Sequence, residues 1–305
     1  MSGGTSYGAI LSYLPENLRE LLTKINHEQL EGLMEIRLRV GSGFFFVYPD
    51  RIAYLMKNGE LSSVYGDRSY RVSVATIRNI VERLCHYSMH SCEKQLREGF
   101  FVIENGVRVG VSGEFSSGAS GVISEFTSLN FRLSRAVSGC ADEIFSRFYG
   151  KSIIICGGVN SGKTTVLREL CRLTGNFSKV TLVDERNEIA CLMNGVPQND
   201  VGIMTDVIGN CRRSAGILGA IRTLSPDLIF CDEIASADDV SSIIGGLACG
   251  VKFVVTAHGS SYDEVVKRHE ICKLIDSGFF EGIIFLKGSN APSVISEVRR
   301  LRNAD

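Results

Sequence analysis

Residues 151–165 read Lys-Ser-Ile-Ile-Ile-Cys-Gly-Gly-Val-Asn-Ser-Gly-Lys-Thr-Thr and contain the spacing G-x-x-x-x-G-K-[ST]. The fixed positions of that pattern are filled by Gly157, Gly162, Lys163 and Thr164. The β-branched run before them, 152–156, predicts a buried strand, and the apolar residues of 165–173 recur at helical spacing. A strand, a glycine-rich loop and a helix in this order are typical of a nucleotide phosphate-binding loop.

The phosphate loop predicts a role for each of its residues. Glycines let successive backbone N–H groups turn toward a phosphate, and the N-terminus of the following helix adds partial positive charge. We expect Lys163 to bridge the β- and γ-phosphates of ATP, and the Thr164 hydroxyl to bind Mg²⁺. The predicted nucleotide-binding residues are Gly157, Gly158, Val159, Asn160, Ser161, Gly162, Lys163, Thr164 and Thr165.

Composition narrows the class of protein. The chain has 305 residues, of which 44% are hydrophobic and 22% charged, so it can form two globular domains. The formal net charge of −1 gives no global reason to expect nucleic-acid binding, although it does not exclude a local basic face. The sequence shows neither a signal-peptide pattern nor an apolar run of ~20 residues that could span a bilayer. We expect a cytoplasmic protein, peripheral to a membrane only through its partners.

The ten cysteines are scattered through the chain, and this favours reduced, buried thiols over a disulfide framework. One local group supplies four potential zinc ligands, Cys85, His86, His90 and Cys92. Their spacing matches no common structural zinc site, and one short segment rarely supplies a whole tetrahedron. We therefore interpret this group as a helix end with polar tips.

The first half of the chain mixes short strands and helices. Alternating apolar and polar residues predict several strands, and Asn105-Gly106 predicts a tight hairpin turn because both residues tolerate positive φ. A predicted helix over 141–149 closes this half. We expect a small α+β domain over residues 1–150, with disorder over residues 1–8.

From residue 151 onward, predicted strands and helices alternate. The strands fall near 152–156, 179–183, 227–231, 251–256 and 282–286. The helices fall near 165–174, 214–224, 237–248 and 262–276. This alternation predicts a parallel sheet with helices on both faces, and hence an α/β domain over residues 151–305.

A second nucleotide-associated motif lies at 228–233, Leu-Ile-Phe-Cys-Asp-Glu. An apolar strand that ends in two acids after a phosphate loop is a Walker B arrangement. We expect Asp232 to hold the Mg²⁺ shell and Glu233 to polarise the attacking water.

Further polar residues follow neighbouring predicted strands. His258 follows the strand 252–256, at the sheet edge where the γ-phosphate would lie, and could sense loss of phosphate. Residues 184–188, Asp-Glu-Arg-Asn-Glu, follow another strand and either order Mg²⁺ or water, or only cap the strand with charge. Transition-state charge also calls for an arginine. The candidates, among which spacing does not choose, are Arg132, Arg135, Arg212, Arg213 and Arg222.

With these motifs in hand, the sequence resembles the stage III sporulation protein AA family, ATPases similar to those of type II and type IV secretion systems. The phosphate loop carries this resemblance together with 35–40, 99–113, 128–132, 183–189, 195–198, 205–207, 225–227, 232–234 and 256–259. These stretches occur in order across both predicted domains, so the resemblance covers most of the chain.

The resemblance implies an α/β, RecA-like P-loop NTPase domain with a mostly parallel sheet, preceded by a smaller α+β domain. It also implies a homo-oligomeric ring, usually a hexamer, that hydrolyses ATP with Mg²⁺. In that family the ATPase is thought to power a channel between mother cell and forespore during sporulation, so membrane-embedded channel proteins are the expected partners.

The resemblance also implies residue roles. Residues 184–188 correspond to the acidic box of secretion ATPases, with Glu185 as the catalytic candidate, and His258 corresponds to their histidine box. Arg222 falls where those ATPases carry an arginine ahead of Walker B. The predicted catalytic residues are Lys163, Glu185, Arg222, Glu233 and His258, and the predicted metal ligands are Thr164 and Asp232.

One position departs from the family pattern. Met204, before Thr205-Asp206-Val207, stands where an arginine is expected, and Arg212 or Arg213 is the candidate replacement.

Two other functions were compared with the secretion-type motor. A nucleic-acid-associated RecA-like ATPase is disfavoured because the net charge is near zero and the chain stops at Asp305, which leaves no room for a single-strand-binding module. A nucleotide-dependent scaffold that barely turns ATP over is disfavoured by the intact Glu233. We therefore expect an ATPase motor without a nucleic-acid partner.

Overall fold

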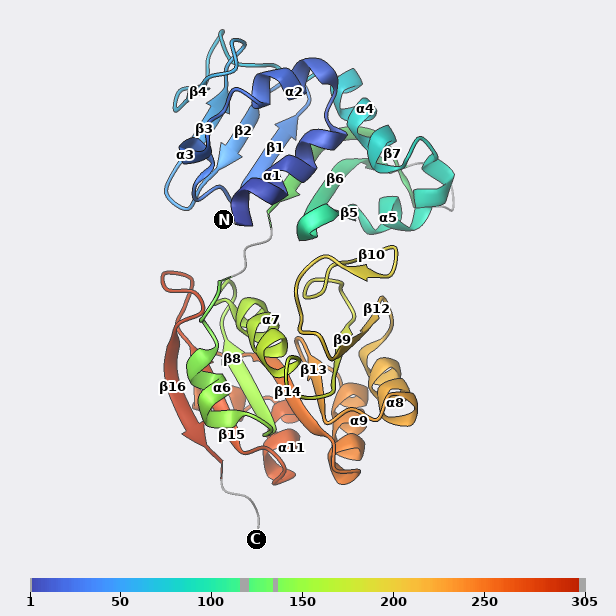
Figure 1. The fold of residues 1–305 in the computed structure, drawn as a ribbon, viewed down its shortest axis with the longest axis vertical. Helices are drawn as coiled ribbons and strands as arrows, with labels where there is room; N and C mark the ends of the chain where they lie inside the picture. The colour runs from blue at the N-terminus through green and yellow to red at the C-terminus, as the bar shows by residue number, and fades with distance from the viewer. Residues whose placement is uncertain (1, 116–120, 134–136, 302–305) are drawn as a thin grey trace. The chain divides into compact units, whose positions relative to one another are not determined.

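The computed structural model of the chain describes residues 2–115, 121–133 and 137–301 (Figure 1). The chain divides into two compact units, residues 1–135 and 136–305. Each unit has its own seven-stranded sheet and its own hydrophobic core.

The first unit is built on an antiparallel sheet in the order β4-β3-β2-β1-β7-β6-β5. Its strands are β1 (Glu35–Arg39), β2 (Phe44–Val47), β3 (Ile52–Leu55), β4 (Leu61–Ser62), β5 (Phe100–Ile103), β6 (Val107–Phe115) and β7 (Ile123–Arg132). Alternate residues of each strand face the core, such as Ile36 and Leu38 in β1. The sheet therefore has one buried face, as the alternating sequence predicts.

The helices of the first unit bury that face. They are α1 (Ser2–Tyr13), α2 (Glu16–Leu22), α3 (His27–Leu30), α4 (Val74–Leu84) and α5 (Glu93–Glu98). The predicted disorder of residues 1–8 is wrong, because α1 begins at Ser2. Tyr7 and Ile10 lie in the hydrophobic core, and the Tyr7 hydroxyl donates a 2.9 Å hydrogen bond to the Leu22 carbonyl. Tertiary contacts thus stabilise a helix that its glycine-rich sequence does not favour.

The boundary between the units lies at 135/136 and not at 150. The difference is helix α6 (Asp142–Phe148), which the sequence analysis assigned to the first domain. Ile144 and Phe148 of α6 belong to the same hydrophobic cluster as Ile153 of the second sheet. The helix therefore packs on the unit that follows it.

The second unit holds the predicted parallel sheet, in the order β12-β9-β13-β14-β8-β15-β16, with only β16 antiparallel to its neighbour. These strands are β8 (Ile153–Gly157), β9 (Val180–Asp184), β12 (Thr205–Gly209), β13 (Leu228–Cys231), β14 (Lys252–His258), β15 (Gly282–Leu286) and β16 (Ile295–Arg300). A separate short hairpin consists of β10 (Leu192–Met193) and β11 (Val196–Pro197).

Helices cover both faces of this sheet. The helices other than α6 are α7 (Lys163–Thr174), α8 (Arg213–Thr223), α9 (Ala237–Ala248), α10 (Tyr262–Val265) and α11 (His269–Asp276). Helices α6 and α7 contribute to one hydrophobic cluster, and α8, α9, α10 and α11 contribute to the other (Figure 1). The doubly covered α/β fold is confirmed, and it brings the carboxyl ends of β8, β9, β13 and β14 to one edge.

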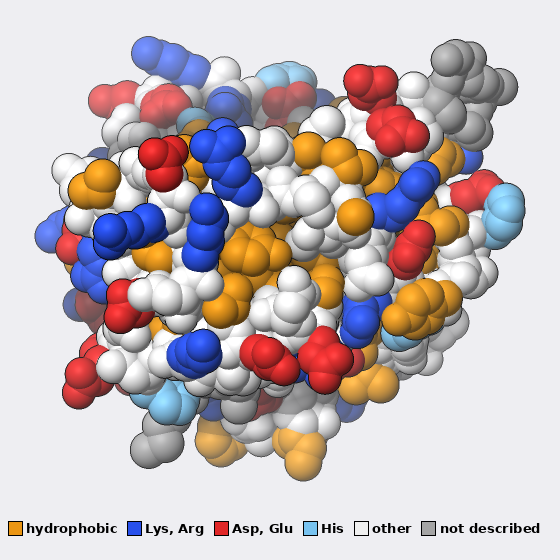
Figure 2. Space-filling model, turned by 90° about the horizontal axis from the view of Figure 1, so that it is seen from above, with side chains coloured by type: hydrophobic (Ala, Val, Ile, Leu, Met, Phe, Trp, Pro, Cys, Tyr) orange, Lys and Arg blue, Asp and Glu red, His pale blue; other side chains and the backbone are white. Residues whose placement is uncertain are grey.

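Two surface properties bear on the function. Within the described ranges, no helix is long and apolar enough to cross a membrane. The face drawn in Figure 2 carries basic, acidic and hydrophobic side chains interspersed. This mixture agrees with the formal net charge of −1.

Candidate functional site

The phosphate loop connects the fully buried strand β8 to the first residue of α7, Lys163. The Lys163 ammonium folds back onto this loop, where Nζ donates to the carbonyls of Gly157 at 2.9 Å and Gly158 at 2.8 Å. Burial lowers the pKa of Lys163, while the charges of Asp232 and Glu233 oppose that shift. The chain thus holds a cation at the centre of the loop.

The loop has its shape because two of its glycines have no room for a side chain. A Cβ on Gly162, whose φ is +87°, would lie 2.3 Å from the Ser293 hydroxyl. A Cβ on Gly157 would lie 2.3 Å from the Ser161 hydroxyl. The Ser293 N–H also donates to the Ser161 carbonyl at 2.8 Å, so the turn between β15 and β16 supports the loop. Backbone groups can therefore approach a phosphate closely there.

A hydrogen-bonded network joins the predicted phosphate loop to the end of strand β13. The Thr164 hydroxyl donates to Asp232 Oδ2 at 2.8 Å. The hydroxyl of Thr256, a buried residue of β14, donates to Asp232 Oδ1 and accepts the Glu233 N–H at 2.7 Å. Because β13 and β14 are parallel neighbours, their carboxyl ends place these three residues together. Thr256 therefore positions both acids that follow β13, Asp232 and Glu233.

Replacing Thr256 by valine should destabilise the protein by about 1–3 kcal/mol, because the isosteric methyl group leaves the part-buried Glu233 N–H without an acceptor. Urea unfolding of Thr256→Val and Thr256→Ser measures this effect. Serine keeps the hydroxyl and should retain most of the stability. Equal stability of the valine variant and the parent would show that the hydroxyl does not hold Glu233.

The acidic segment after β9 is organised by Asp184. The buried Asp184 carboxylate accepts the backbone N–H groups of Glu188 at 2.9 Å, Ile189 at 3.0 Å and Ala190 at 2.9 Å. Burial raises the pKa of Asp184 above its usual range, although these three hydrogen bonds oppose the shift. Asp184 therefore shapes the turn that carries the other acids.

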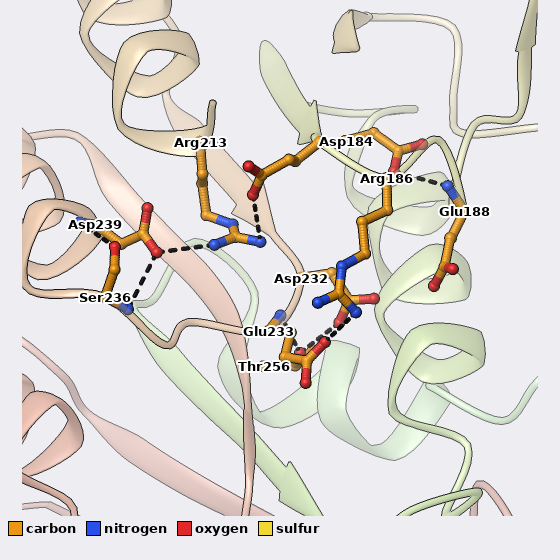
Figure 3. A network of polar contacts seen from close by, with 10 residues as sticks. Asp184, Arg186, Glu188, Arg213, Asp232, Glu233, Ser236, Asp239 and Thr256 are labelled. Carbon is orange, nitrogen blue, oxygen red and sulfur yellow. Dashed lines mark hydrogen bonds and ion pairs between the residues drawn. The ribbon is translucent and has the colours of Figure 1, made fainter. Parts of the chain in front are cut away.

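The predicted catalytic residue Glu185 is engaged in an ion pair. Its carboxylate lies 3.0 Å from Arg213 Nη2, and Arg213 Nη1 lies 2.8 Å from Asp239 of α9. Figure 3 shows Arg213 between Asp239 and the turn after β9. The Arg213 side chain is only 8% exposed, so it links α8, α9 and this turn in the interior.

An arginine of the turn after β9, Arg186, contacts Glu233. Arg186 Nη1 donates to Glu233 Oε2 at 2.6 Å (Figure 3). Glu233 adopts a left-handed backbone conformation, with φ of +49°, which is rare for a residue with a side chain. A pocket surrounds this pair. Its lining residues are Val183, Asp184, Glu185, Arg186, Glu188, Arg213, Asp232 and Glu233.

The structure brings most of the predicted site residues to one sheet edge. Thr164, Asp232 and Glu233 are linked there through hydrogen bonds that include Thr256, and Lys163 contacts the loop that precedes Thr164. His258 ends β14 opposite Gly157, and its buried Nδ1 has no hydrogen-bond partner among the described residues. The predicted cluster is thus assembled by strand order.

The candidates for the arginine that stabilises transition-state charge lie in different places. Arg222 is exposed in the last turn of α8, whereas Arg213 begins that helix beside the site. At 1.5 Å per residue, the two are separated by roughly 13 Å along the helix axis. Arg132 lies in the first unit, 3.6 Å from Glu35, and Arg135 lies outside the described residues. Arg222 therefore does not reach the site of its own chain.

The four potential zinc ligands do not converge. Cys85 and Cys92 are buried, whereas the His90 side chain is 98% exposed and pairs with Glu93. Within 2–115, 121–133 and 137–301, no group of three or more His, Cys, Asp or Glu side chains is arranged for a metal ion.

Two contacts of the site were not anticipated from the sequence. Arg186 was considered only as part of the acidic segment, and Thr256 only as a strand residue before His258. Their positions near the carboxyl ends of β9 and β14 could have identified them as site residues, because polar residues at these strand ends meet at one edge of the sheet.

The donor set fits a nucleotide with Mg²⁺. Thr164, at the end of the predicted phosphate loop, and Asp232, at the end of β13, offer hard oxygen ligands 2.8 Å apart. The glycines leave the loop backbone accessible, and Lys163 supplies a positive charge. These residues would hold the metal and the phosphates.

Comparisons with known proteins identify a matching family and similar sequences. The family model for sporulation stage III, protein AA, matches residues 6–303. Stage III sporulation protein AA of Bacillus subtilis (strain 168) is 31% identical over 300 residues, which cover 95% of this chain and 94% of that protein. The protein SEEDLING PLASTID DEVELOPMENT 1 of Arabidopsis thaliana is 30% identical over 152 residues, 48% of this chain and 22% of that protein.

Two solved structures share the fold. The Legionella pneumophila ATPase DotB has a TM-score of 0.58 at 17% identity, covering 89% of this chain and 76% of its own. The pilus retraction motor PilT with bound ADP has a TM-score of 0.56 at 14% identity, covering 83% of this chain and 74% of its own. The chain therefore shares its fold with this ATPase and this pilus retraction motor.

Proposed function

The chain belongs to the sporulation stage III, protein AA family, and from this membership and the site geometry we propose that it is an ATP-hydrolysing motor. By analogy with secretion ATPases, it powers a transport channel between mother cell and forespore. The observation that supports this most is the Thr164–Asp232 hydrogen bond, which joins the phosphate loop to Walker B with Glu233 alongside.

The residues of the chain divide the chemistry among them. The loop N–H groups and Lys163 bind the phosphates. Thr164 and Asp232 would hold Mg²⁺, which would supply positive charge to neutralise the phosphates. Glu233 accepts a proton from water as the water oxygen bonds to the γ-phosphorus and the bond to the bridging oxygen breaks. ADP leaves with the electron pair, and the proton passes on to the released phosphate.

Other predicted residues support this reaction. His258 lies beside the phosphate loop and is proposed to sense the γ-phosphate. Glu185, expected to be catalytic, is proposed instead to position the turn through its ion pair with Arg213.

Replacing Lys163 by alanine should abolish ATP binding and hydrolysis, because it removes the cation that the loop holds. Phosphate release from Mg-ATP by the full chain, with nucleotide binding measured in parallel, tests the proposal. ATP hydrolysis by Lys163→Ala at the rate of the parent protein would contradict the assignment of the site.

We also propose that the chain works as a homo-oligomeric ring, with six copies, attached to membrane-embedded channel proteins. Arg222 is remote from the site of its own chain, so it can act only on the site of a neighbouring copy. Specific ATPase activity should then rise as copies associate, and Arg222→Ala should lower it by about 10³-fold while ATP stays bound. A specific activity that stays constant while light scattering shows assembly would argue against a shared site.

A further inference from the structure

We propose that Arg186 is a γ-phosphate sensor of this site in addition to His258, and that its guanidinium alternates between two anions. One is the Glu233 carboxylate, which it binds in the structure, and the other is the terminal phosphate of ATP. The inference rests on the proposed function. It assigns to one residue of the same chain both restraint of the base and recognition of ATP over ADP.

The contact between Arg186 and Glu233 is short and exposed to solvent. Arg186 Nη1 and Glu233 Oε2 are 2.6 Å apart, and the two side chains are 64% and 43% exposed. An ion pair this exposed contributes little to stability, so its exchange for another anion costs little. While the pair exists, the guanidinium occupies Glu233 Oε2, one of the two carboxylate oxygens.

Hydrogen bonds also hold both backbones, whereas the ion pair with Glu233 that holds the arginine side chain is exposed. Asp184 accepts three N–H groups of the turn, and the Asn187 side chain hydrogen-bonds the N–H and the carbonyl of Leu192. Arg186 lies between these two anchors. On the opposite side, Thr256 holds the Glu233 N–H. The guanidinium can therefore swing without moving the turn.

The charged groups that line the pocket also favour the exchange of Arg186 between anions. Among the described residues that line the pocket are five carboxylates and two guanidinium groups. The buried Arg213 side chain forms ion pairs with Glu185 and Asp239. Arg186, in contrast, contacts an exposed carboxylate next to Asp232, the acid that Thr164 contacts. A guanidinium binds phosphate oxygens in a planar fork, so a phosphate arriving beside Asp232 would compete for it.

The exchange has a functional consequence. ADP lacks the terminal phosphate and leaves Arg186 on Glu233. ATP would draw Arg186 away, which adds positive charge to the phosphate and frees Glu233 to accept a proton. The base would therefore become available only with the hydrolysable nucleotide.

The test removes one of the two anions, the Glu233 carboxylate, so that only the contact with phosphate remains. In a Glu233→Gln background the charge pair is already absent, so Arg186→Ala can only affect nucleotide binding. Equilibrium dialysis with labelled ATP and ADP and Mg²⁺ gives both dissociation constants. We expect Arg186→Ala to weaken ATP binding by about 10- to 100-fold, the range for hydrogen bonds to charged groups. ADP binding should change less than about twofold, since its phosphates do not meet Arg186.

A matched control exists in α6. Arg147 and Glu143 form a pair at 3.0 Å with exposures of 52% and 56%, and Arg147→Ala in the same background should change neither constant. Arg186→Lys keeps the charge and should restore part of the ATP affinity. Equal losses for ATP and ADP, or no loss for either, would overturn the sensor. If the Glu233→Gln parent bound neither nucleotide, the proposed ATPase function itself would fail first.

Discussion

Replacing Glu233 by glutamine is expected to slow ATP hydrolysis by about 10²- to 10⁴-fold, the usual contribution of a general base. The amide has the same shape as the carboxylate and cannot accept the proton of the attacking water. The Glu233 N–H bond to Thr256 does not involve the side chain, so the local backbone should persist. ATP binding should remain, because the phosphate loop is untouched.

Steady-state phosphate release measures this loss, with nucleotide affinity determined on the same preparation. The matched control is Glu143→Gln, which neutralises an exposed glutamate of α6 and should leave the rate unchanged. If Glu233→Gln released phosphate as fast as the parent protein, another group would have to accept the proton.

Replacing Arg213 by alanine is expected to lower the free energy of unfolding by about 3–5 kcal/mol, the cost of removing one partner of a buried ion pair. Arg213 and Asp239 are 8% and 7% exposed, so the substitution leaves Asp239 charged and unpaired in the interior. It also releases Glu185 and with it the turn that carries Arg186.

Urea denaturation gives the magnitude. The neighbouring Arg212 is exposed, and Arg212→Ala should stay within about 0.5 kcal/mol of the parent. Because a buried ion pair can be replaced by apolar groups at little cost, Arg213→Met with Asp239→Leu should be more stable than Arg213→Ala. A free energy of unfolding for Arg213→Ala equal to that of Arg212→Ala would mean that water reaches Asp239.

The motifs of the site could be predicted because their information is local. The phosphate loop depends on a spacing within eight residues, and a strand that ends in two acids identifies Asp232 and Glu233. The alternation of strands and helices predicted the parallel sheet, since both faces of such a sheet are covered.

Contacts that depend on strand order could not be predicted in the same way. Arg186 and Glu233 are 47 residues apart, and Glu233 and Thr256 are 23 apart. They meet because β9, β13 and β14 are adjacent in the sheet. No spacing rule encodes that order.

Helix α6 and the first turns of α1 were misassigned for a related reason. The apolar face of α6 fits a helix in either unit, and only the contacts of Ile144 and Phe148 decide which core it joins. Tyr7 is buried by residues that follow it in the chain. Local helix propensity gives no information about the core against which either helix packs.

Single-turnover conversion of ATP, with the protein in excess over labelled ATP and Mg²⁺, tests most directly whether the chain is an ATPase. Under these conditions, slow product release cannot hide the chemical step. We expect the wild-type chain to convert its bound ATP to ADP and phosphate, whereas Glu233→Gln should hold ATP intact over the same time. If the wild-type chain bound ATP and kept it intact as the variant does, it would be a nucleotide-dependent scaffold and not a motor.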